Sequence, residues 1–395
     1  MESRKQKDSG HTLSIHARPD ILWKSSQPLL GAIDIELTER CNNNCVHCCI
    51  NLPEHDTAAC AKEMTTEHCK DLIRQAAELG ALTVRMTGGE PLLRDDFVDI
   101  YLYARRLGMK VMIFTNGRLI TPSMADLFAR VPPLEAIELT VYGMRKATYE
   151  SVTGKKGSFE EFQSGLKNLL DRNIPVYVKG TLLPANRHEI NDFIAWAQSL
   201  PRMDDLASFV MFLELRHRRD SERKNKRIAK MRLSPEEGLK VLTMQPELYR
   251  KEMKKFFDHF MMKPTDLVFT CNAANRVCID AYGNIQYCLA LRHPDTVLDS
   301  RRYSLEYAVK EFFPKLRGMR SRNADFLSRC ARCFLRGFCD QCPAKSWNES
   351  GTLDQPADYW CRIAHEQARY LNIIGNGENA WEVKNWRDRI KRMAE

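Results

Sequence analysis

The sequence predicts an α/β fold built on six successive β–α repeats, followed by a cysteine-rich C-terminal extension. Between residues 31 and 216, short apolar runs alternate with longer runs of helical periodicity. From residue 271 onward that periodicity fades and eight cysteines appear. Hydrophobic residues make up 44% of the 395-residue chain, which is enough to form a substantial core.

The expected strands are residues 32–38, 82–87, 110–115, 136–142, 176–183 and 208–215. The expected helices between them are residues 67–79, 95–107, 122–130, 159–172 and 189–200. Crossovers of this kind are right-handed, so the parallel sheet either curls into a barrel or lies open. Polar sites are expected at the carboxyl ends of its strands.

The same pattern divides the chain into five segments. They are an N-terminal segment (1–30), the β–α series (31–216), a helical connector (217–264), the cysteine-rich domain (265–365) and a C-terminal region (366–395) whose helix begins near residue 380. The N-terminal segment is charged and lacks the apolar stretch of a signal peptide. No apolar run approaches the ~18 residues of a membrane span, so we expect a cytoplasmic protein.

The net charge of +9 is modest for this length, and much of it lies in residues 216–232. The simplest interpretation of this basic run is a solvated helical face. The main alternative is a patch for an acidic substrate or redox partner. Nucleic acid is not expected as a partner, because aromatic residues do not interleave with the basic ones.

Three cysteines, Cys41, Cys45 and Cys48, form a CX3CX2C motif directly after the first strand. Three thiolates leave one iron of an iron–sulfur cluster open to an outside ligand. A zinc site would usually need a fourth nearby ligand, and His47 and Cys49 both adjoin Cys48 in sequence, where side chains rarely share a metal. The spacing therefore favours an iron–sulfur cluster over zinc.

The second strand ends in the sequence TGGEP, residues 87–91. The two glycines permit a close backbone approach to a ligand, and Glu90 is suited to hold a cation such as an amino group. Alone the string is a weak signal, but here it follows CX3CX2C by one β–α unit.

Together these features resemble the radical S-adenosylmethionine (radical SAM) superfamily over roughly residues 31–216. The resemblance implies a partial (β/α)6 barrel in which Cys41, Cys45 and Cys48 bind a [4Fe–4S] cluster. It also implies that the open iron takes the amino and carboxylate groups of S-adenosylmethionine (SAM). The reduced cluster would transfer one electron to SAM, releasing methionine and a 5′-deoxyadenosyl radical that removes hydrogen from a substrate carbon.

The resemblance also assigns contacts to SAM. Gly88, Gly89 and Glu90 would line the methionine amino group, and the backbone near His47 would meet the adenine. An electron donor of the flavodoxin or ferredoxin type is implied as a partner.

The ribose and carboxylate contacts match the family less closely. Thr115, Asn116 and Thr140 end the third and fourth strands, where the family places these contacts. Many relatives carry Ser at the fourth strand and an Arg further along, where this chain has Thr140 and then residues 152–153. Lys179 is a candidate substitute for that Arg.

A second set of cysteines lies in the C-terminal extension. Cys330, Cys333, Cys339 and Cys342 are spaced CX2CX5CX2C, which by itself would suit a zinc knuckle or one local tetrad. With the remaining four cysteines, the pattern resembles the SPASM extension of radical SAM enzymes. That resemblance implies two auxiliary [4Fe–4S] clusters with interleaved ligands. The first would take Cys271, Cys278, Cys288 and Cys342; the second would take Cys330, Cys333, Cys339 and Cys361.

Three cysteines remain unassigned, namely Cys49, Cys60 and Cys69, and we interpret them as packing residues. Four residues are unranked candidates for a general base: Tyr142, His217, Tyr287 and His293.

Resemblance to SPASM enzymes favours modification of a ribosomally synthesised precursor peptide. One SPASM class, the anaerobic sulfatase maturases, carries Asp after the GX4C cysteine, where this chain has Leu289, so that activity is not expected. The alternative is small-molecule chemistry, such as oxidative decarboxylation of tetrapyrrole side chains, with the basic residues 216–219 binding carboxylates.

Overall fold

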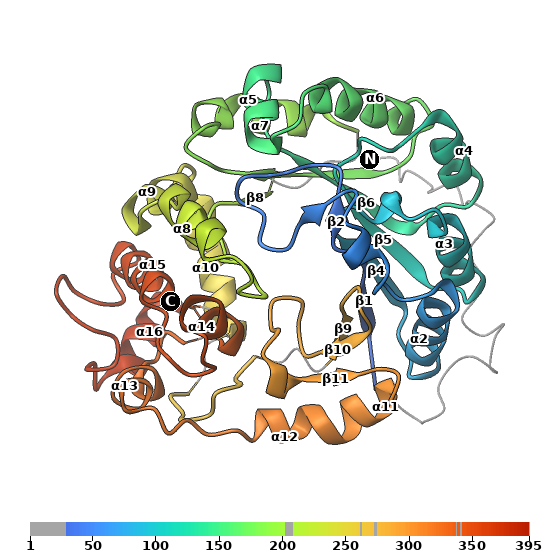
Figure 1. Ribbon diagram of the computed structural model, residues 1–395. Helices are drawn as coiled ribbons and strands as arrows, with labels where there is room; N and C mark the ends of the chain where they lie inside the picture. The colour runs from blue at the N-terminus through green and yellow to red at the C-terminus, as the bar shows by residue number, and fades with distance from the viewer. Residues whose placement is uncertain are drawn as a thin grey trace, which may run out of the picture.

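The computed structural model describes residues 29–201, 208–260, 263–271, 275–336, 338–339 and 342–394 (Figure 1). Its main sheet has nine strands in the order β11-β10-β9-β1-β4-β5-β6-β7-β8. The first six β–α repeats supply β1 (Ala32–Thr38), β4 (Thr83–Gly88), β5 (Lys110–Thr115), β6 (Leu134–Val141), β7 (Val176–Thr181) and β8 (Ser208–Val210). These six strands are parallel neighbours and the sheet does not close on itself, which confirms a partial barrel.

Helices cover one face of this sheet (Figure 1). They are α2 (Thr66–Glu78), α3 (Phe97–Arg106), α4 (Pro122–Arg130), α5 (Lys146–Thr153), α6 (Ser158–Leu170) and α7 (Ile190–Ser199). Thr65 and Thr121 cap α2 and α4 by accepting backbone N–H bonds. The five predicted helices are present with shifts of one or two residues at their ends, and α5 was not predicted.

The alternation of β1 shows how the sequence sets the two faces of the sheet. Ile33, Ile35 and Leu37 belong to the main hydrophobic core beneath the helices. The intervening Asp34 and Glu36 point to the opposite, inner face, because successive strand residues alternate sides. Both carboxylates are almost fully buried, so the inner face of the barrel is polar but largely closed to water.

The sixth strand is shorter than predicted and ends at Val210. Met211 and Leu213 remain buried, which explains the apolar pattern of the sequence. The backbone nevertheless leaves the sheet, and the carbonyl of Leu213 accepts a 2.8 Å bond from Arg232 Nε. The apolar pattern of the sequence therefore did not distinguish a strand from an irregular buried segment.

The connector that follows is helical, as expected, with α8 (Glu222–Met231), α9 (Pro235–Leu242) and α10 (Pro246–Phe260). Ser234 and Glu237 form a capping box at the start of α9. The predicted N-terminal segment lies outside the described residues up to residue 28. Among the helices that the structure describes, none is long and apolar enough to cross a membrane.

The cysteine-rich region joins the same sheet. Strand β9 (Arg276–Ile279) pairs in parallel with β1, and β10 (Asn284–Gln286) and β11 (Val297–Asp299) extend the sheet as antiparallel strands. The remaining elements are α11 (Leu305–Tyr307), α12 (Phe313–Arg317), α13 (Ala324–Ser328), α14 (Pro343–Ser350), α15 (Asp358–Tyr370) and α16 (Trp386–Ala394).

This region is more regular than its sequence suggested. Helix α15 packs with α10 and α16 around a second hydrophobic cluster that includes Tyr249, Phe334 and Ala368. A hydrophobic cluster therefore helps to hold this part of the chain together, although the periodicity of its sequence fades. The last helix begins at Trp386 rather than near residue 380.

Candidate active site

The CX3CX2C loop leaves the sheet at the carboxyl end of β1, passing through the short strand β2 (Arg40–Cys41). Its backbone is anchored to the end of α5: Asn44 N donates to the carbonyl of Thr153 at 2.8 Å, and Val46 N to that of Val152 at 3.1 Å. Arg118 donates to the carbonyl of Asn42 at 2.5 Å. The loop is thus held by hydrogen bonds before any cofactor is considered.

The three motif thiols lie close together. Burial raises the pKa of the Cys45 thiol most, and the charges of Cys41 and Cys48 raise it further. Backbone N–H groups already point at two of the sulfurs: Asn43 N lies 3.4 Å from Cys41 Sγ, and Asn51 N lies 3.4 Å from Cys48 Sγ. Such donors stabilise thiolates, while burial raises the pKa of Cys48 to about 11. Among the described residues no three His, Cys, Asp or Glu side chains are already placed to hold a metal ion, so the three thiols share one loop with N–H donors but do not form a preassembled metal site. Binding of a metal cluster would displace their protons.

The two glycines of TGGEP sit where β4 meets the cysteine loop. A Cβ on Gly88, whose φ is +124°, would lie 2.1 Å from the carbonyl oxygen of Thr38. A Cβ on Gly89 would lie 2.2 Å from the carbonyl oxygen of Arg40. Only glycine allows this approach, so both residues position the start of the cysteine loop against the end of β4.

Glu90 connects the ends of β4 and β5. Its carboxylate is fully buried and accepts hydrogen bonds from Thr115 Oγ1 at 2.7 Å and from Asn116 N at 2.8 Å. Asn116 Nδ2 in turn donates to Asn42 Oδ1 at 2.7 Å, which connects this group to the cysteine loop. The structure thus brings together three of the residues that the sequence assigned to SAM, next to Cys41.

His47 and Tyr142 pack together beside the loop, with ring centroids 5.9 Å apart. Burial lowers the pKa of His47 to about 4, so the imidazole is neutral, and its Nδ1 has no hydrogen-bond partner. Thr140 and Lys179 are paired neighbours on β6 and β7. Lys179 Nζ lies 3.8 Å from Glu138 Oε1, so its charge already faces a carboxylate on the inner face.

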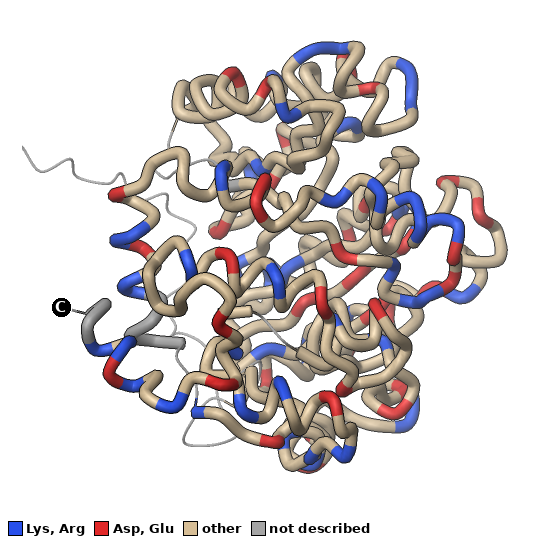
Figure 2. The backbone as a smooth tube through the Cα atoms, turned by 90° about the vertical axis from the view of Figure 1, so that its left-hand side faces the viewer, with Lys and Arg blue, Asp and Glu red and all other residues tan. Residues whose placement is uncertain are grey.

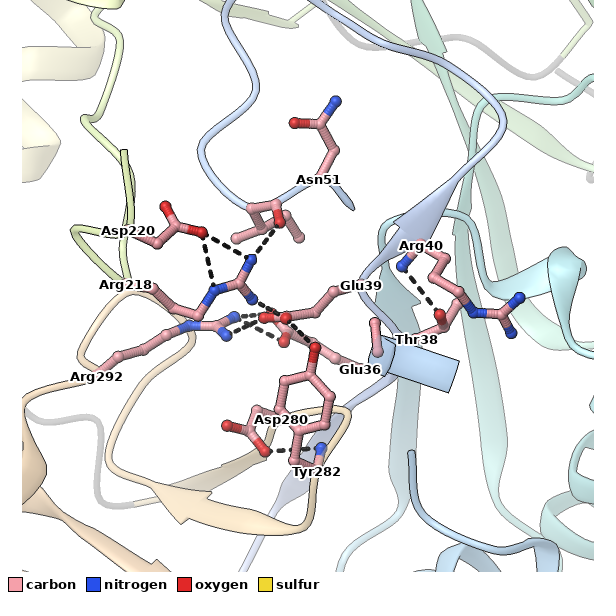
Figure 3. A network of polar contacts seen from close by, with 12 residues as sticks. Glu36, Thr38, Glu39, Arg40, Asn51, Arg218, Asp220, Asp280, Tyr282 and Arg292 are labelled. Atoms are coloured by element: carbon pink, nitrogen blue, oxygen red, sulfur yellow. Dashed lines mark hydrogen bonds and ion pairs between the residues drawn. The ribbon is translucent and has the colours of Figure 1, made fainter. Parts of the chain in front are cut away.

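A buried network of charges lies at the end of β1 (Figure 3). Arg292 donates to both carboxylate oxygens of Glu36, at 2.7 and 2.6 Å, and also pairs with Glu39. Glu39 pairs with Arg218 as well and accepts a 2.6 Å bond from the Tyr282 hydroxyl. Removing one member of such a buried set typically costs about 3–5 kcal/mol, because the partner charge is left unpaired. The network joins β1, the connector and the cysteine-rich region.

Cys49 lies outside the motif register and contacts the connector instead. Its carbonyl accepts a 3.2 Å bond from His217 N, and His217 Nε2 lies 2.7 Å from Glu214 Oε2. Burial opposes ionisation of His217, but the charges of Cys49 and Glu214 outweigh it and raise the pKa to about 10. His217 is therefore a cation at neutral pH, suited to donate a proton rather than to accept one.

The other candidate general bases are dispersed. Tyr142 lies beside Cys45, and burial raises its pKa, so it stays protonated. The Tyr287 hydroxyl donates to the carbonyl of Cys271 at 3.0 Å. His293 packs edge-on against Trp347, whose Nε1 donates to the carbonyl of His217 at 2.8 Å. Of these four candidates, His217 and His293 both contact Trp347.

The eight C-terminal cysteines fall into two groups in space. Cys330, Cys333, Cys339 and Cys361 line one small pocket, together with Arg329, Arg336, His365 and Trp381. Burial, followed by the charge of Cys361, raises the pKa of Cys330 to about 11. Cys342 does not line this pocket, although it is closer in sequence to Cys339 than Cys361 is.

The other group lies beside β1 and β9. Cys278 and Cys288 line a cavity of about 640 Å³ with Asp34, Arg85 and other residues. The charges of Cys342 and Cys271 both act on Cys288, adding to the effect of burial in raising the pKa of its thiol. Cys361, and not Cys342, thus lines the pocket with Cys330, Cys333 and Cys339, while the assignment of cluster ligands stays a prediction.

The sequence of the region around this site matches a known protein family. Residues 35–197 match the model of the radical SAM superfamily. These residues form a radical SAM domain. The match covers β1 to α7 and includes the cysteine loop, Glu90 and the ends of β5, β6 and β7.

Curated relatives of this chain include heme synthases, a mycofactocin maturase and a molybdenum cofactor biosynthesis protein. The chain is 31% identical over 165 residues to the AdoMet-dependent heme synthase of Methanosarcina barkeri, covering 42% of this chain and 46% of that one. It is 34% identical over 134 residues to the mycofactocin maturase MftC of Mycolicibacterium smegmatis, covering 34% and 33%. The chain thus spans less than half the length of these two relatives. A heme synthase from Oleidesulfovibrio alaskensis is 22% identical over 353 residues, covering 83% and 86%.

The fold extends beyond the radical SAM domain. Streptococcus suis SuiB, solved with its precursor peptide SuiA, aligns with a TM-score of 0.59 at 16% identity, covering 85% of this chain and 76% of that one. At this identity the likeness concerns the fold. The aligned share of this chain is larger than the radical SAM domain, so the likeness extends beyond residues 35–197.

Several site residues were missed from the sequence. Glu36, Glu39, Glu214 and Arg292 were not singled out, and neither was Trp347. The polar residues alternating within residues 32–38 could have indicated an inner polar face. The partners in the connector and the cysteine-rich region gave no such signal, because they lie more than 160 residues away.

Proposed function

We propose that this protein uses SAM and a [4Fe–4S] cluster to abstract hydrogen from a ribosomally synthesised precursor peptide. Cys41, Cys45 and Cys48 would hold the cluster, and Glu90 would hold the amino group of SAM. When bound and reduced, the cluster supplies the electron that breaks a carbon–sulfur bond of SAM and yields the radical. The observation that carries the proposal is the junction of the cysteine loop with Glu90, built by Gly88 and Gly89 at the end of β4.

The chain's own residues have distinct roles in this proposal. Thr115 and Asn116 orient the Glu90 carboxylate by hydrogen bonds, and Asn116 also fixes Asn42 in the cysteine loop. The neutral His47 and the ring of Tyr142 offer an apolar wall for adenine. Thr140 and Lys179, on the inner face, are proposed to contact the ribose and the carboxylate.

The affinity for SAM should depend on the charge of Glu90. Burial raises the pKa of this carboxyl to about 7, so it is increasingly protonated below that pH. A protonated carboxyl cannot pair with the SAM ammonium, so affinity should fall by up to about tenfold between pH 7 and pH 6. Isothermal titration calorimetry at pH 6, 7 and 8 measures this. A dissociation constant that does not change with pH contradicts the assignment.

Glu90→Gln should weaken SAM binding by about 30-fold or more, since a buried charge partner is lost, and should abolish most of the pH dependence. Glu189→Gln is the matched control. Glu189 is also buried and accepts hydrogen bonds from Met144 N at 2.6 Å and Thr148 Oγ1 at 2.7 Å, but it is not part of the proposed SAM site. Equal weakening in both variants would indicate a general effect on the fold.

A peptide suits the inner face better than a polycarboxylate does. The basic residues expected to bind tetrapyrrole carboxylates already have internal partners. Arg216 pairs with Asp220, Arg218 with Glu39, and His217 with Glu214. Arg219 donates to the carbonyls of Trp347 and Asn348 at 2.9 and 2.8 Å. A substrate rich in carboxylates would have to displace these partners, which are partly or wholly buried.

Tetrapyrrole side-chain chemistry is the second candidate. It is favoured by the Oleidesulfovibrio alaskensis relative, which aligns over most of both chains and is named a heme synthase. The relative named as a maturase matches a shorter segment, at higher identity.

Mass spectrometry can separate the two substrates. Reconstituted protein with SAM and dithionite would be incubated in parallel with a short peptide encoded beside its gene and with an iron coproporphyrin. If the substrate is a peptide, we expect more 5′-deoxyadenosine in its presence than in its absence, and a modified peptide. Both should be absent with Cys48→Ala. Loss of carbon dioxide from the coproporphyrin, with the peptide unchanged, would establish the second candidate instead.

We also propose that the extension binds two further [4Fe–4S] clusters in SPASM fashion. Cys271, Cys278, Cys288 and Cys342 would ligate one, and Cys330, Cys333, Cys339 and Cys361 the other. The spatial grouping of the thiols supports this division. Full ligation by four cysteines suits electron transfer or a structural role rather than substrate binding.

A further inference from the structure

One cavity of the molecule has no role in the proposed chemistry. It has a volume of about 900 Å³ and reaches the cysteine loop at Cys41. Its lining includes Asn43, Asn44 and residues 51–56 on one side. On the other side it is lined by Lys155, just after α5, and by Arg223, Lys224 and Arg227 of α8.

The basic run of residues 216–232 divides into two parts in the structure. Its first part is neutralised internally, as the pairs of Arg216 and Arg218 show. Its second part, α8, is exposed along the cavity at Arg223 and Arg227. These two positions are four residues apart and therefore lie on one face of the helix.

The cations at the cavity lack carboxylate partners. Among the described residues, no ion pair is formed by Lys155, Arg223 or Arg227, while Lys224 Nζ lies 3.4 Å from the carbonyl oxygen of Asn51. Two acidic residues, Glu54 and Asp56, also line the cavity, so cations outnumber carboxylates there. Asp56 caps α1 (Thr57–Cys60) by accepting a 2.9 Å bond from Ala59 N.

On the side of the molecule where α8, α9 and α15 lie in Figure 1, Lys and Arg are interspersed with Asp and Glu (Figure 2). A set of uncompensated cations around an opening to Cys41 is therefore a local feature rather than a consequence of the net charge alone. Such a set attracts an acidic partner and speeds its association.

We propose that the rim formed by Lys155, Arg223, Lys224 and Arg227 is the docking surface for a small acidic electron-carrier protein of the flavodoxin type. This inference rests on the proposed function, because it places the carrier next to the loop that would hold the SAM cluster. Only an electron would be transferred: the carrier would lose one electron, and the cluster that Cys41, Cys45 and Cys48 would hold would gain it.

The test is charge reversal on α8. Arg223→Glu/Arg227→Glu alters the cavity rim, and Lys226→Glu/Lys230→Glu is the matched control. The control positions are exposed on the same helix, carry the same charge and do not line the cavity. Both double variants change the net charge equally, so a general electrostatic effect acts on both.

Binding of a purified flavodoxin to the reconstituted protein would be measured by flavin fluorescence at two salt concentrations. The rim variant should bind about tenfold more weakly than the unmodified protein at low salt and lose most of the salt dependence, since the attraction of screened charges is removed. The control should bind nearly as well as the unmodified protein. Unchanged affinity in the rim variant, or equal weakening in both variants, would overturn the docking proposal.

SAM cleavage driven by dithionite separates this proposal from the function on which it depends. The rim variant should form 5′-deoxyadenosine at the normal rate with dithionite and more slowly with reduced flavodoxin. Equal loss with both reductants means that the rim acts on SAM or the cluster, which contradicts docking. Absence of dithionite-driven cleavage in the unmodified, cluster-loaded protein contradicts the proposed function instead.

Discussion

Cys48→Ala is expected to form no detectable 5′-deoxyadenosine, a loss of about 1,000-fold or more, because the electron for SAM cleavage comes from the cluster that Cys48 would ligate. The structure places the Cys48 sulfur in the cysteine loop with Asn51 N 3.4 Å away. Its iron content should fall from about twelve atoms per chain to about eight, as one of three [4Fe–4S] clusters is lost.

Cys49→Ala is the matched control, since it removes the same atom from the adjacent residue. Cys49 contacts His217 through its carbonyl, which the substitution leaves intact, and through its thiol, which the substitution removes. The variant should still retain all the iron and most of the SAM cleavage, because Cys49 is not among the proposed ligands. Loss of iron in Cys49→Ala, with Cys48→Ala unaffected, would contradict the proposed choice of ligands.

The iron content of double variants of the auxiliary cysteines should differ by about four atoms per chain, depending on which two cysteines are replaced together. Cys330→Ala/Cys361→Ala removes two ligands of one proposed cluster and should leave about eight irons. Cys330→Ala/Cys342→Ala removes one ligand from each cluster and should leave about four. The reason is spatial: Cys361 shares a pocket with Cys330, and Cys342 does not line it.

The local-tetrad alternative predicts the reverse order. If Cys330, Cys333, Cys339 and Cys342 formed one site, the pair with Cys342 would lose a single cluster and the pair with Cys361 would lose two. Iron analysis with Mössbauer spectroscopy distinguishes the two cases. Either double variant should still hold the SAM cluster and cleave SAM with dithionite if it folds, which provides an internal check on the count.

The barrel could be predicted because its strands follow one another in sequence and alternate with helices. The same reasoning failed for β9, which has four residues and depends on pairing with β1, more than 230 residues earlier. It also missed α15: Trp360, Ile363 and Ala364 have helical spacing, but Cys361 in the same segment was interpreted as a metal ligand. Non-local pairing and a competing motif thus account for the main errors.

The candidate site was predictable where one motif lies in one loop. Cys41, Cys45, Cys48 and the end of β4 were predicted from the spacing of two motifs together with the resemblance to radical SAM enzymes. The charged residues around them could not be predicted from the sequence. Arg292 pairs with Glu36, which lies 256 residues earlier in the chain, and Arg218 of the connector pairs with Glu39. The division of the basic run into a neutralised part and an exposed part likewise depends on tertiary contacts.

The most direct measurement is the product formed from SAM by the unmodified protein. After anaerobic reconstitution and reduction with dithionite, incubation with SAM should yield 5′-deoxyadenosine and methionine, identified by mass spectrometry, and omission of the reductant should abolish both. A protein that carries its full iron content and binds SAM, yet forms no 5′-deoxyadenosine under reduction, would contradict the account of the cysteine loop and Glu90 as a site for reductive SAM cleavage.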